Sequence, residues 1–134
     1  MHEIDGFARV QTFSIESAAM QPDKLLAESR AGPRERQRIL RLAGSFTMAT
    51  LSVFQDAMQA GDAPSLIIEM SEVSRIDSAG VGALVQAYVS CRRAGGRLAL
   101  VGVNTRVQAV LQMAGFDKLF ATYAHLGEAE QALA

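Results

Sequence analysis

The chain has 134 residues, 49% of them hydrophobic, which is the size and composition of one globular domain. Its 13 Lys and Arg residues nearly balance 14 Asp and Glu residues, and the net charge of −1 argues against direct nucleic-acid binding. Cys91 is the only cysteine, and His2 and His125 are the only histidines, so an intrachain disulfide and a Cys- or His-rich metal site are excluded. We expect no cofactor. Because no apolar run is long enough to span a membrane and the first residues lack a secretory signal, we expect a cytoplasmic protein without membrane insertion.

The N-terminal part of the chain offers two candidates for a first strand. Phe13 and Ile15 alternate with polar residues, and residues 25–29 form the second candidate. We favour residues 25–29, because a short turn at Gly32-Pro33 would let them pair with a strand over residues 37–42. Residues 1–22 are then expected to be an N-terminal extension, and residues 23–134 to be the single domain.

From residue 37 onward, predicted strands alternate with predicted helices. Leu51, Phe54 and Met58 recur at helical spacing, whereas residues 66–68 form a continuous apolar run that is typical of a strand buried on both faces. This alternation predicts an α/β fold, with helices packed against a mostly parallel sheet. The patterns predict strands over 37–42, 65–70 and 97–101 and a helix over 48–59. A second helix is expected to begin at or just after Ser78 and to close at Arg92-Arg93, and a third to be capped by Asn104 or Thr105 and ended by Gly115. A short final helix is expected to carry Leu126, Ala129 and Leu133.

The segment Asp77-Ser78-Ala79-Gly80-Val81-Gly82 is the strongest candidate for a functional site. It joins a predicted buried strand to an amphipathic helix, and Ser78 is expected at the N-cap or in the first turn. There its hydroxyl would lie beside free backbone N–H groups, at a position that tolerates a phosphate. Gly80 and Gly82 would allow a partner to approach closely. The simpler interpretation is that Ser78 only caps the helix and the glycines only permit tight packing.

A catalytic interpretation of the same segment is weaker. Ser78, Asp117 and His125 could in principle form a hydrolase triad. However, a nucleophile elbow requires glycine where Ile76 stands, and the chain is short for that fold. Cys91 has no histidine near it in sequence, so we expect a packed small side chain and not a nucleophile.

Basic residues are concentrated between residues 30 and 41. A functional patch here could bind phosphate groups or an acidic partner. The simpler interpretation is a solvated turn and sheet edge whose charges block unwanted strand pairing, and we favour it. The run consists of Arg30, Arg34, Arg36, Arg38 and Arg41.

Three segments together resemble the STAS domain family, which includes anti-sigma factor antagonists and domains of sulfate transporters. The first, residues 67–80, reads Ile-Ile-Glu-Met-Ser-Glu-Val-Ser-Arg-Ile-Asp-Ser-Ala-Gly and is similar to the family's strand, turn and Asp-Ser-x-Gly helix start. The resemblance continues through residues 92–102 and 110–120, and covers residues 24–134 in all. It implies a small mixed β-sheet with helices mainly on one face.

The resemblance also implies a regulatory role without enzymatic activity. An antagonist of this family binds an anti-sigma factor that is a serine/threonine kinase, is phosphorylated and released by it, and is reset by a phosphatase. Ser78 would be the phosphoacceptor, while Glu69 stands where the family usually has Asp. The alternative is a non-phosphorylated scaffold in a membrane lipid-transport ATPase complex or a larger signalling assembly, and the intact Ser78 favours the antagonist. The predicted partner-binding residues are Glu69, Asp77, Ser78, Ala79, Gly80 and Gly82.

Overall fold

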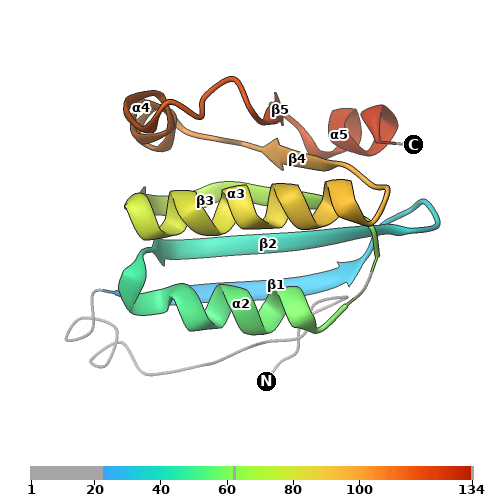
Figure 1. The fold of residues 1–134 in the computed structure, drawn as a ribbon, viewed down its shortest axis with the longest axis horizontal. Coiled ribbons are helices and arrows are strands. Elements are labelled where there is room, and N and C mark those ends of the chain that lie inside the picture. The colour runs from blue at the N-terminus through green and yellow to red at the C-terminus, as the bar shows by residue number, and fades with distance from the viewer. Residues whose placement is uncertain (1–22, 62, 134) are drawn as a thin grey trace.

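The computed structural model describes residues 23–61 and 63–133, which form a five-stranded sheet of order β1-β2-β3-β4-β5 (Figure 1). β1 is antiparallel to β2, and β2 to β5 are parallel. The predicted α/β fold is therefore confirmed. The elements are β1 (Leu25–Ala31), β2 (Gln37–Phe46), η1 (Met48–Thr50), α2 (Leu51–Gln59), β3 (Ser65–Ile76), α3 (Ser78–Arg93), β4 (Leu98–Val101), α4 (Thr105–Ala114), β5 (Ala121–Tyr123) and α5 (Leu126–Ala132).

The first two strands form the hairpin that the sequence favoured. Leu25 of β1 lies opposite Gly44 of β2, and the register continues to the turn. There the N–H of Gly32 donates to the carbonyl oxygen of Gln37 at 2.8 Å. The alternative strand at Phe13 and Ile15 and the proposed extension over residues 1–22 lie outside the described residues, so the division at residue 22 stays a prediction.

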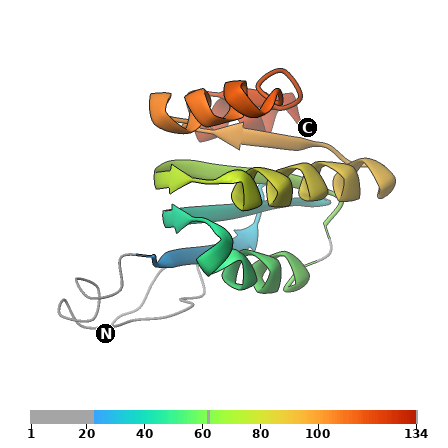
Figure 2. The ribbon, with the colours of Figure 1, turned by 60° about the vertical axis from the view of Figure 1, so that its left-hand side comes forward.

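Helices cover the two faces of the sheet unequally. α2, α3 and α4 each cross from one parallel strand to the next, and their apolar side chains share one large core with β1 to β4. Figure 2 shows α2 and α3 on the same side of the sheet. α5 packs on the opposite face, where Ala129 meets a smaller cluster from β2, β3 and β4. The expectation of helices mainly on one face is met.

The third strand is longer than its apolar run predicts. The sequence indicated a strand over 65–70, but β3 continues to Ile76. Two register shifts against β2 accompany the extension, and Val73 and Ile76 still reach the large core. Such bulges bend and twist a strand locally. The long β3 delivers the chain directly to the start of α3. β5 was not predicted, because three residues carry too short a pattern.

Arg38 departs from the expectation of a solvated basic run. It is 6% exposed and lies under the end of α2. Its guanidinium donates to the carbonyl oxygens of Ala57 and Met58 and, at 2.9 Å, to the hydroxyl of Ser29. The last carbonyls of a helix have no partner within it, and a cation there complements the helix dipole. Arg38 thus ties α2 to the hairpin.

Replacing Arg38 by Met should lower the free energy of unfolding by about 1–3 kcal/mol, because the carbonyl of Met58 loses its buried donor and that of Ala57 keeps only the N–H of Ala60. Urea unfolding followed by circular dichroism measures this loss. Arg34→Met, at an exposed position of the hairpin, is the matched control and should change stability little. Equal midpoints for the two variants would contradict the structural role of Arg38.

Candidate functional site

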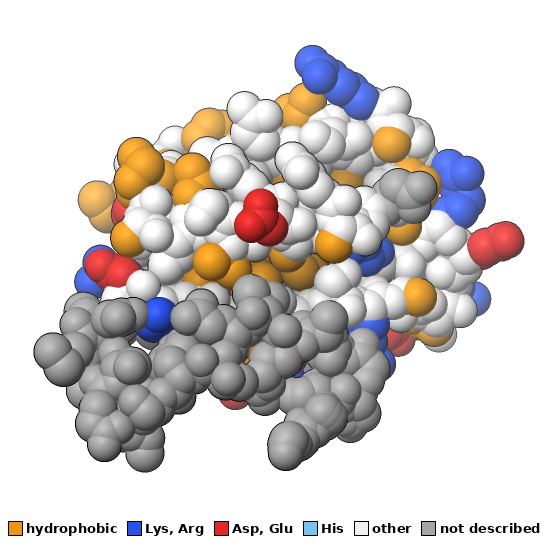
Figure 3. All heavy atoms as spheres, turned by 90° about the horizontal axis from the view of Figure 1, so that it is seen from below, with side chains coloured by type: hydrophobic (Ala, Val, Ile, Leu, Met, Phe, Trp, Pro, Cys, Tyr) orange, Lys and Arg blue, Asp and Glu red, His pale blue; other side chains and the backbone are white. Residues whose placement is uncertain are grey.

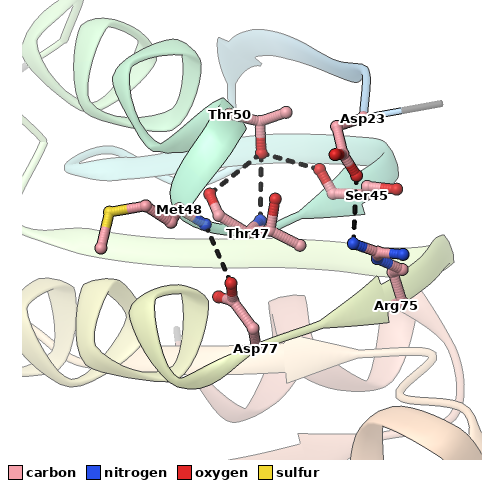
Figure 4. A network of polar contacts seen from close by, with 7 residues as sticks. All are labelled: Asp23, Ser45, Thr47, Met48, Thr50, Arg75 and Asp77. Carbon is pink, nitrogen blue, oxygen red and sulfur yellow. Dashed lines mark hydrogen bonds and ion pairs between the residues drawn. The ribbon is translucent and has the colours of Figure 1, made fainter. Parts of the chain in front are cut away.

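The carboxylate of Asp77 holds the junction between β3 and α3. Asp77 is the N-cap of α3 in extended backbone conformation, and its Oδ1 accepts from the N–H of Gly80 at 3.0 Å. Its Oδ2 accepts from the N–H of Met48 at 3.1 Å (Figure 4). One side chain therefore joins the start of α3 to the start of η1, the turn that leads into α2.

These contacts change the acidity of Asp77. Burial by itself would raise the pKa of the carboxyl, but the backbone N–H groups of Met48, Gly80 and Ala79 donate to the charged form and outweigh it. The net pKa of Asp77 lies below its ordinary value of 3.8. The carboxylate is thus charged at neutral pH and strengthens both hydrogen bonds.

Ser78 is the first residue of α3 and is exposed. The sequence left open whether it caps the helix, and the structure assigns the cap to Asp77. The hydroxyl of Ser78 is therefore not needed as an acceptor for the free backbone N–H groups at the start of the helix. It lies at the positive end of the dipole of a 16-residue helix. That position is accessible to a modifying enzyme and electrostatically tolerant of a phosphate.

The two glycines of the motif have different roles. Gly80 is buried, and a Cβ placed on it would collide with the carbonyl oxygen of Phe46 and lie 2.6 Å from Cγ1 of Ile76. It therefore permits α3 to pack closely on the ends of β2 and β3. Gly82 is exposed, and a Cβ there would meet nothing within 4 Å. Only Gly82 leaves surface open to a partner.

A groove runs between α2 and α3 beside Ser78. Its volume is about 770 Å³. Met48, which is 71% exposed, lies at the same end, since its N–H contacts Asp77. Figure 3, seen from the side of α2, shows hydrophobic side chains interspersed with polar ones. The sequence did not single out Met48. Its exposed position in η1 follows from β2 continuing to Phe46, beyond the predicted end at residue 42. Residues lining the groove include Leu51, Phe54, Met58, Ala79, Gly82 and Ala83.

Glu69 is not brought to this site. It lies in the middle of β3, paired with Arg41 and Val101 in register, and alternates with the core residue Ile68. Its carboxylate accepts from the hydroxyl of Ser71 at 2.6 Å and borders a hollow on the face that carries α5. The structure thus collects Asp77, Ser78, Ala79, Gly80 and Gly82 but leaves Glu69 on the opposite face of the sheet. Its role in partner binding stays a prediction.

The residues of the weaker catalytic interpretation are also not collected. His125 is the N-cap of α5, which packs on the face opposite α3. Within the described part of the chain, no three His, Cys, Asp or Glu side chains group as metal ligands. None of the helices in that part is long and apolar enough to cross a membrane. Burial raises the pKa of the Cys91 thiol to about 11, which leaves it protonated and unreactive at neutral pH.

The STAS domain profile covers residues 30–129. The chain belongs to the STAS domain family. Sequence relatives of this STAS domain are named as anti-sigma factor antagonists. A candidate antagonist of Thermotoga neapolitana is 34% identical over 77 residues, which are 58% of this chain and 67% of that protein. The anti-sigma F factor antagonist of Paenibacillus polymyxa is 26% identical over 89 residues, or 63% of this chain and 76% of that one.

Solved structures agree with the STAS fold. An anti-sigma factor antagonist from Mycobacterium paratuberculosis superimposes with a TM-score of 0.69 at 21% identity, covering 84% of this chain and 96% of that one. SpoIIAA in its unphosphorylated form gives a TM-score of 0.64 at 20% identity, covering 81% and 95%. At these identities the likeness concerns the fold, and it agrees with the mixed sheet described above.

The glycines provide a stability test of the STAS domain. Gly80→Ala should lower the free energy of unfolding by about 1–3 kcal/mol, because the added methyl group overpacks the contact with Phe46 and Ile76. Gly82→Ala should leave stability unchanged or raise it by up to about 1 kcal/mol, since alanine favours the helix and meets no neighbour. Thermal and urea unfolding measure both. Equal effects of the two substitutions would contradict the packing described here.

The Asp77 carboxylate predicts a pH dependence of stability. Because its folded pKa is lowered, its stabilisation is present above about pH 4 and is lost as the pH falls through the folded pKa. Asp77→Asn keeps a capping oxygen but loses the charged acceptor for Met48. The variant should be about 1–2 kcal/mol less stable at neutral pH, and the difference should shrink in acid. Urea unfolding across this range tests it, and a difference independent of pH would contradict it.

Proposed function

We propose that this STAS domain is an anti-sigma factor antagonist that binds an anti-sigma factor with serine/threonine kinase activity, and that phosphorylation of Ser78 releases it. The observation that carries the proposal is the exposed hydroxyl at the start of α3, which Asp77 frees from the capping role. The names of the sequence relatives support an anti-sigma factor as the partner. The groove between α2 and α3 and the exposed Met48 offer contact surface beside the hydroxyl.

The physical basis of the switch is electrostatic. A phosphate on Ser78 would add about −1.5 to −2 charges beside the carboxylate of Asp77. The N-terminus of α3 offsets part of this charge, so the fold should persist. In the complex, however, the same phosphate would be desolvated and would repel acidic groups of the partner. Phosphorylation should therefore change affinity far more than structure.

The proposal assigns different tasks to the predicted partner-binding residues. Ser78, Ala79 and Gly82 would contact the partner directly, whereas Asp77 and Gly80 would act by positioning the start of α3. Glu69 lies on the other face, so a partner that contacts both Glu69 and Ser78 would have to reach around the sheet. The domain would act by binding and not by catalysis, in the cytoplasm, and a phosphatase would restore the unmodified serine.

The mass of the protein isolated from its own cells tests the proposal directly. A fraction heavier by one phosphate, mapped by peptide analysis to Ser78, would support the phosphorylation switch. Unmodified protein under several growth and stress conditions would instead favour a constitutive STAS scaffold. Co-purification of a transporter ATPase would then identify the second class of partner.

Ser78→Asp should weaken binding to the anti-sigma factor kinase by at least about tenfold, because it places a permanent charge in the interface. Ser78→Ala should bind as tightly as the wild type but accept no phosphate from the kinase and ATP. Isothermal titration calorimetry measures the affinities. Circular dichroism should show that all variants keep the fold.

Thr105 provides the matched control for this experiment. It is the exposed first residue of α4, follows the capping Asn104, and so occupies the same helical position as Ser78. Thr105→Asp adds the same charge at a different helix start and should leave the affinity unchanged. Wild-type affinity in Ser78→Asp, or an equal loss in Thr105→Asp, would refute Ser78 as the switch.

A further inference from the structure

The end of the sheet opposite Ser78 carries a group of arginines from separate parts of the sequence. The β1–β2 hairpin, the end of α3 and the start of β4 lie together at this end, on the right in Figure 1. In Figure 3 this end is again on the right and shows basic side chains beside an acidic one, with further basic side chains at the opposite end. All five arginines are exposed, and we call them the basic end. They are Arg34, Arg36, Arg92, Arg93 and Arg97.

Backbone contacts hold these segments next to one another. The carbonyl oxygen of Arg36 accepts from the N–H of Ser65 at 3.1 Å, and the N–H of Arg97 donates to the hydroxyl of Ser65 at 3.1 Å. Arg36 and Arg97 therefore flank the start of β3, about 10 Å apart across two strand spacings. α3 ends beside them, since a Cβ on Gly96 would collide with the backbone of Pro64.

The arginines are also partly held in place. The guanidinium of Arg97 donates to the carbonyl oxygen of Ala132 at 3.0 Å. That of Arg92 lies 5.7 Å from the centre of the Tyr88 ring and donates to its hydroxyl. Neither contact neutralises the charge. Among the residues that the structure describes, Glu35 in the hairpin and Glu130 in α5 supply acidic groups at this end, and the five guanidinium groups outnumber them.

We propose that the basic end docks onto the surface of a membrane that contains anionic phospholipids. The hairpin, the end of α3 and the start of β4 meet at one edge of the sheet, which places several exposed arginines where one flat surface can contact them, and a bilayer is a plane of phosphates. Arginine forks bind phosphate oxygens in a bidentate manner. Duplex DNA instead requires an element that enters a groove, and single strands require several stacking aromatics. The ring of Tyr88 already lies against Arg92, so it does not offer a free face on which a base could stack.

This docking is peripheral and leaves the other end of the domain free. Ser78 begins α3, whereas Arg92 and Arg93 end it, so the length of a 16-residue helix separates them. That length is about 24 Å. A domain adsorbed through the basic end would therefore present Ser78 and the groove away from the lipid. Membrane docking and the proposed switch are thus physically compatible and independent.

Vesicle co-sedimentation of the full chain tests the proposal. The protein should bind vesicles of phosphatidylcholine mixed with phosphatidylglycerol, but not phosphatidylcholine alone, and high salt should release it. Arg34→Gln combined with Arg93→Gln should weaken binding by roughly 30-fold, the factor for two basic groups at an anionic surface. The matched control, Arg75→Gln with Arg106→Gln, removes the same charge near the Ser78 end and should bind like the wild type. Ser78→Asp should also bind like the wild type.

Three results would overturn the proposal. The first is failure of the wild type to bind anionic vesicles at low salt. The second is an equal loss in the two double variants, which would indicate a response to net charge alone. The third is binding to a short DNA duplex in preference to vesicles, which would assign the basic end to nucleic acid. None of these results depends on a kinase or on phosphorylation, so they leave the proposed switch untouched.

Discussion

The two hydrogen bonds that the Asp77 carboxylate accepts fix the geometry on which the site depends. α3 and η1 start at the ends of neighbouring parallel strands, and the donors Gly80 and Met48 belong to these two starts. The carboxylate spans them and sets the spacing at which α3 and α2 leave the sheet. The groove lies between those helices. Asp77 thus determines three features at once: the cap of α3, the exposure of Ser78 and the mouth of the groove.

The β2–η1 loop makes this arrangement rigid from the other side. The hydroxyl of Thr50 donates to the carbonyl oxygen of Ser45 at 2.8 Å and accepts from the N–H of Thr47 at 3.1 Å (Figure 4). Thr47 and Thr50 are buried. The N–H of Met48 therefore points at Asp77 from a fixed frame. A preorganised surface loses less entropy when a partner binds, which suits a reversible switch.

The sequence was sufficient for the hairpin, the alternation of strands and helices up to α4 and the place of Ser78, but not for β5 or for the roles of single residues. Asp77 and Ser78 are equally good N-caps, and the choice depends on β3 continuing to Ile76 in extended conformation. Gly80 and Gly82 are about 200° apart around a helix, so one of them faces the sheet and the other faces away from it. Which of the two faces the sheet depends on where α3 starts. The face of the sheet on which Glu69 lies could not be predicted, because its strand begins with a continuous apolar run that shows no alternation between faces. Arg38 was misjudged because no pattern shows which arginine meets the end of α2.

Parallel strands explain why the two ends of the domain differ in charge. In β2 to β4 every strand points the same way, so the helices that follow them begin at one edge and finish at the other. Their dipoles add in the same sense, positive at the edge of Ser78 and negative at the opposite edge. A phosphate is favoured at the first edge, and the arginines that end α3 are favoured at the second. A chain of nearly neutral net charge can therefore carry an anion-accepting end and a cationic end, because the topology of the sheet keeps them a helix length apart.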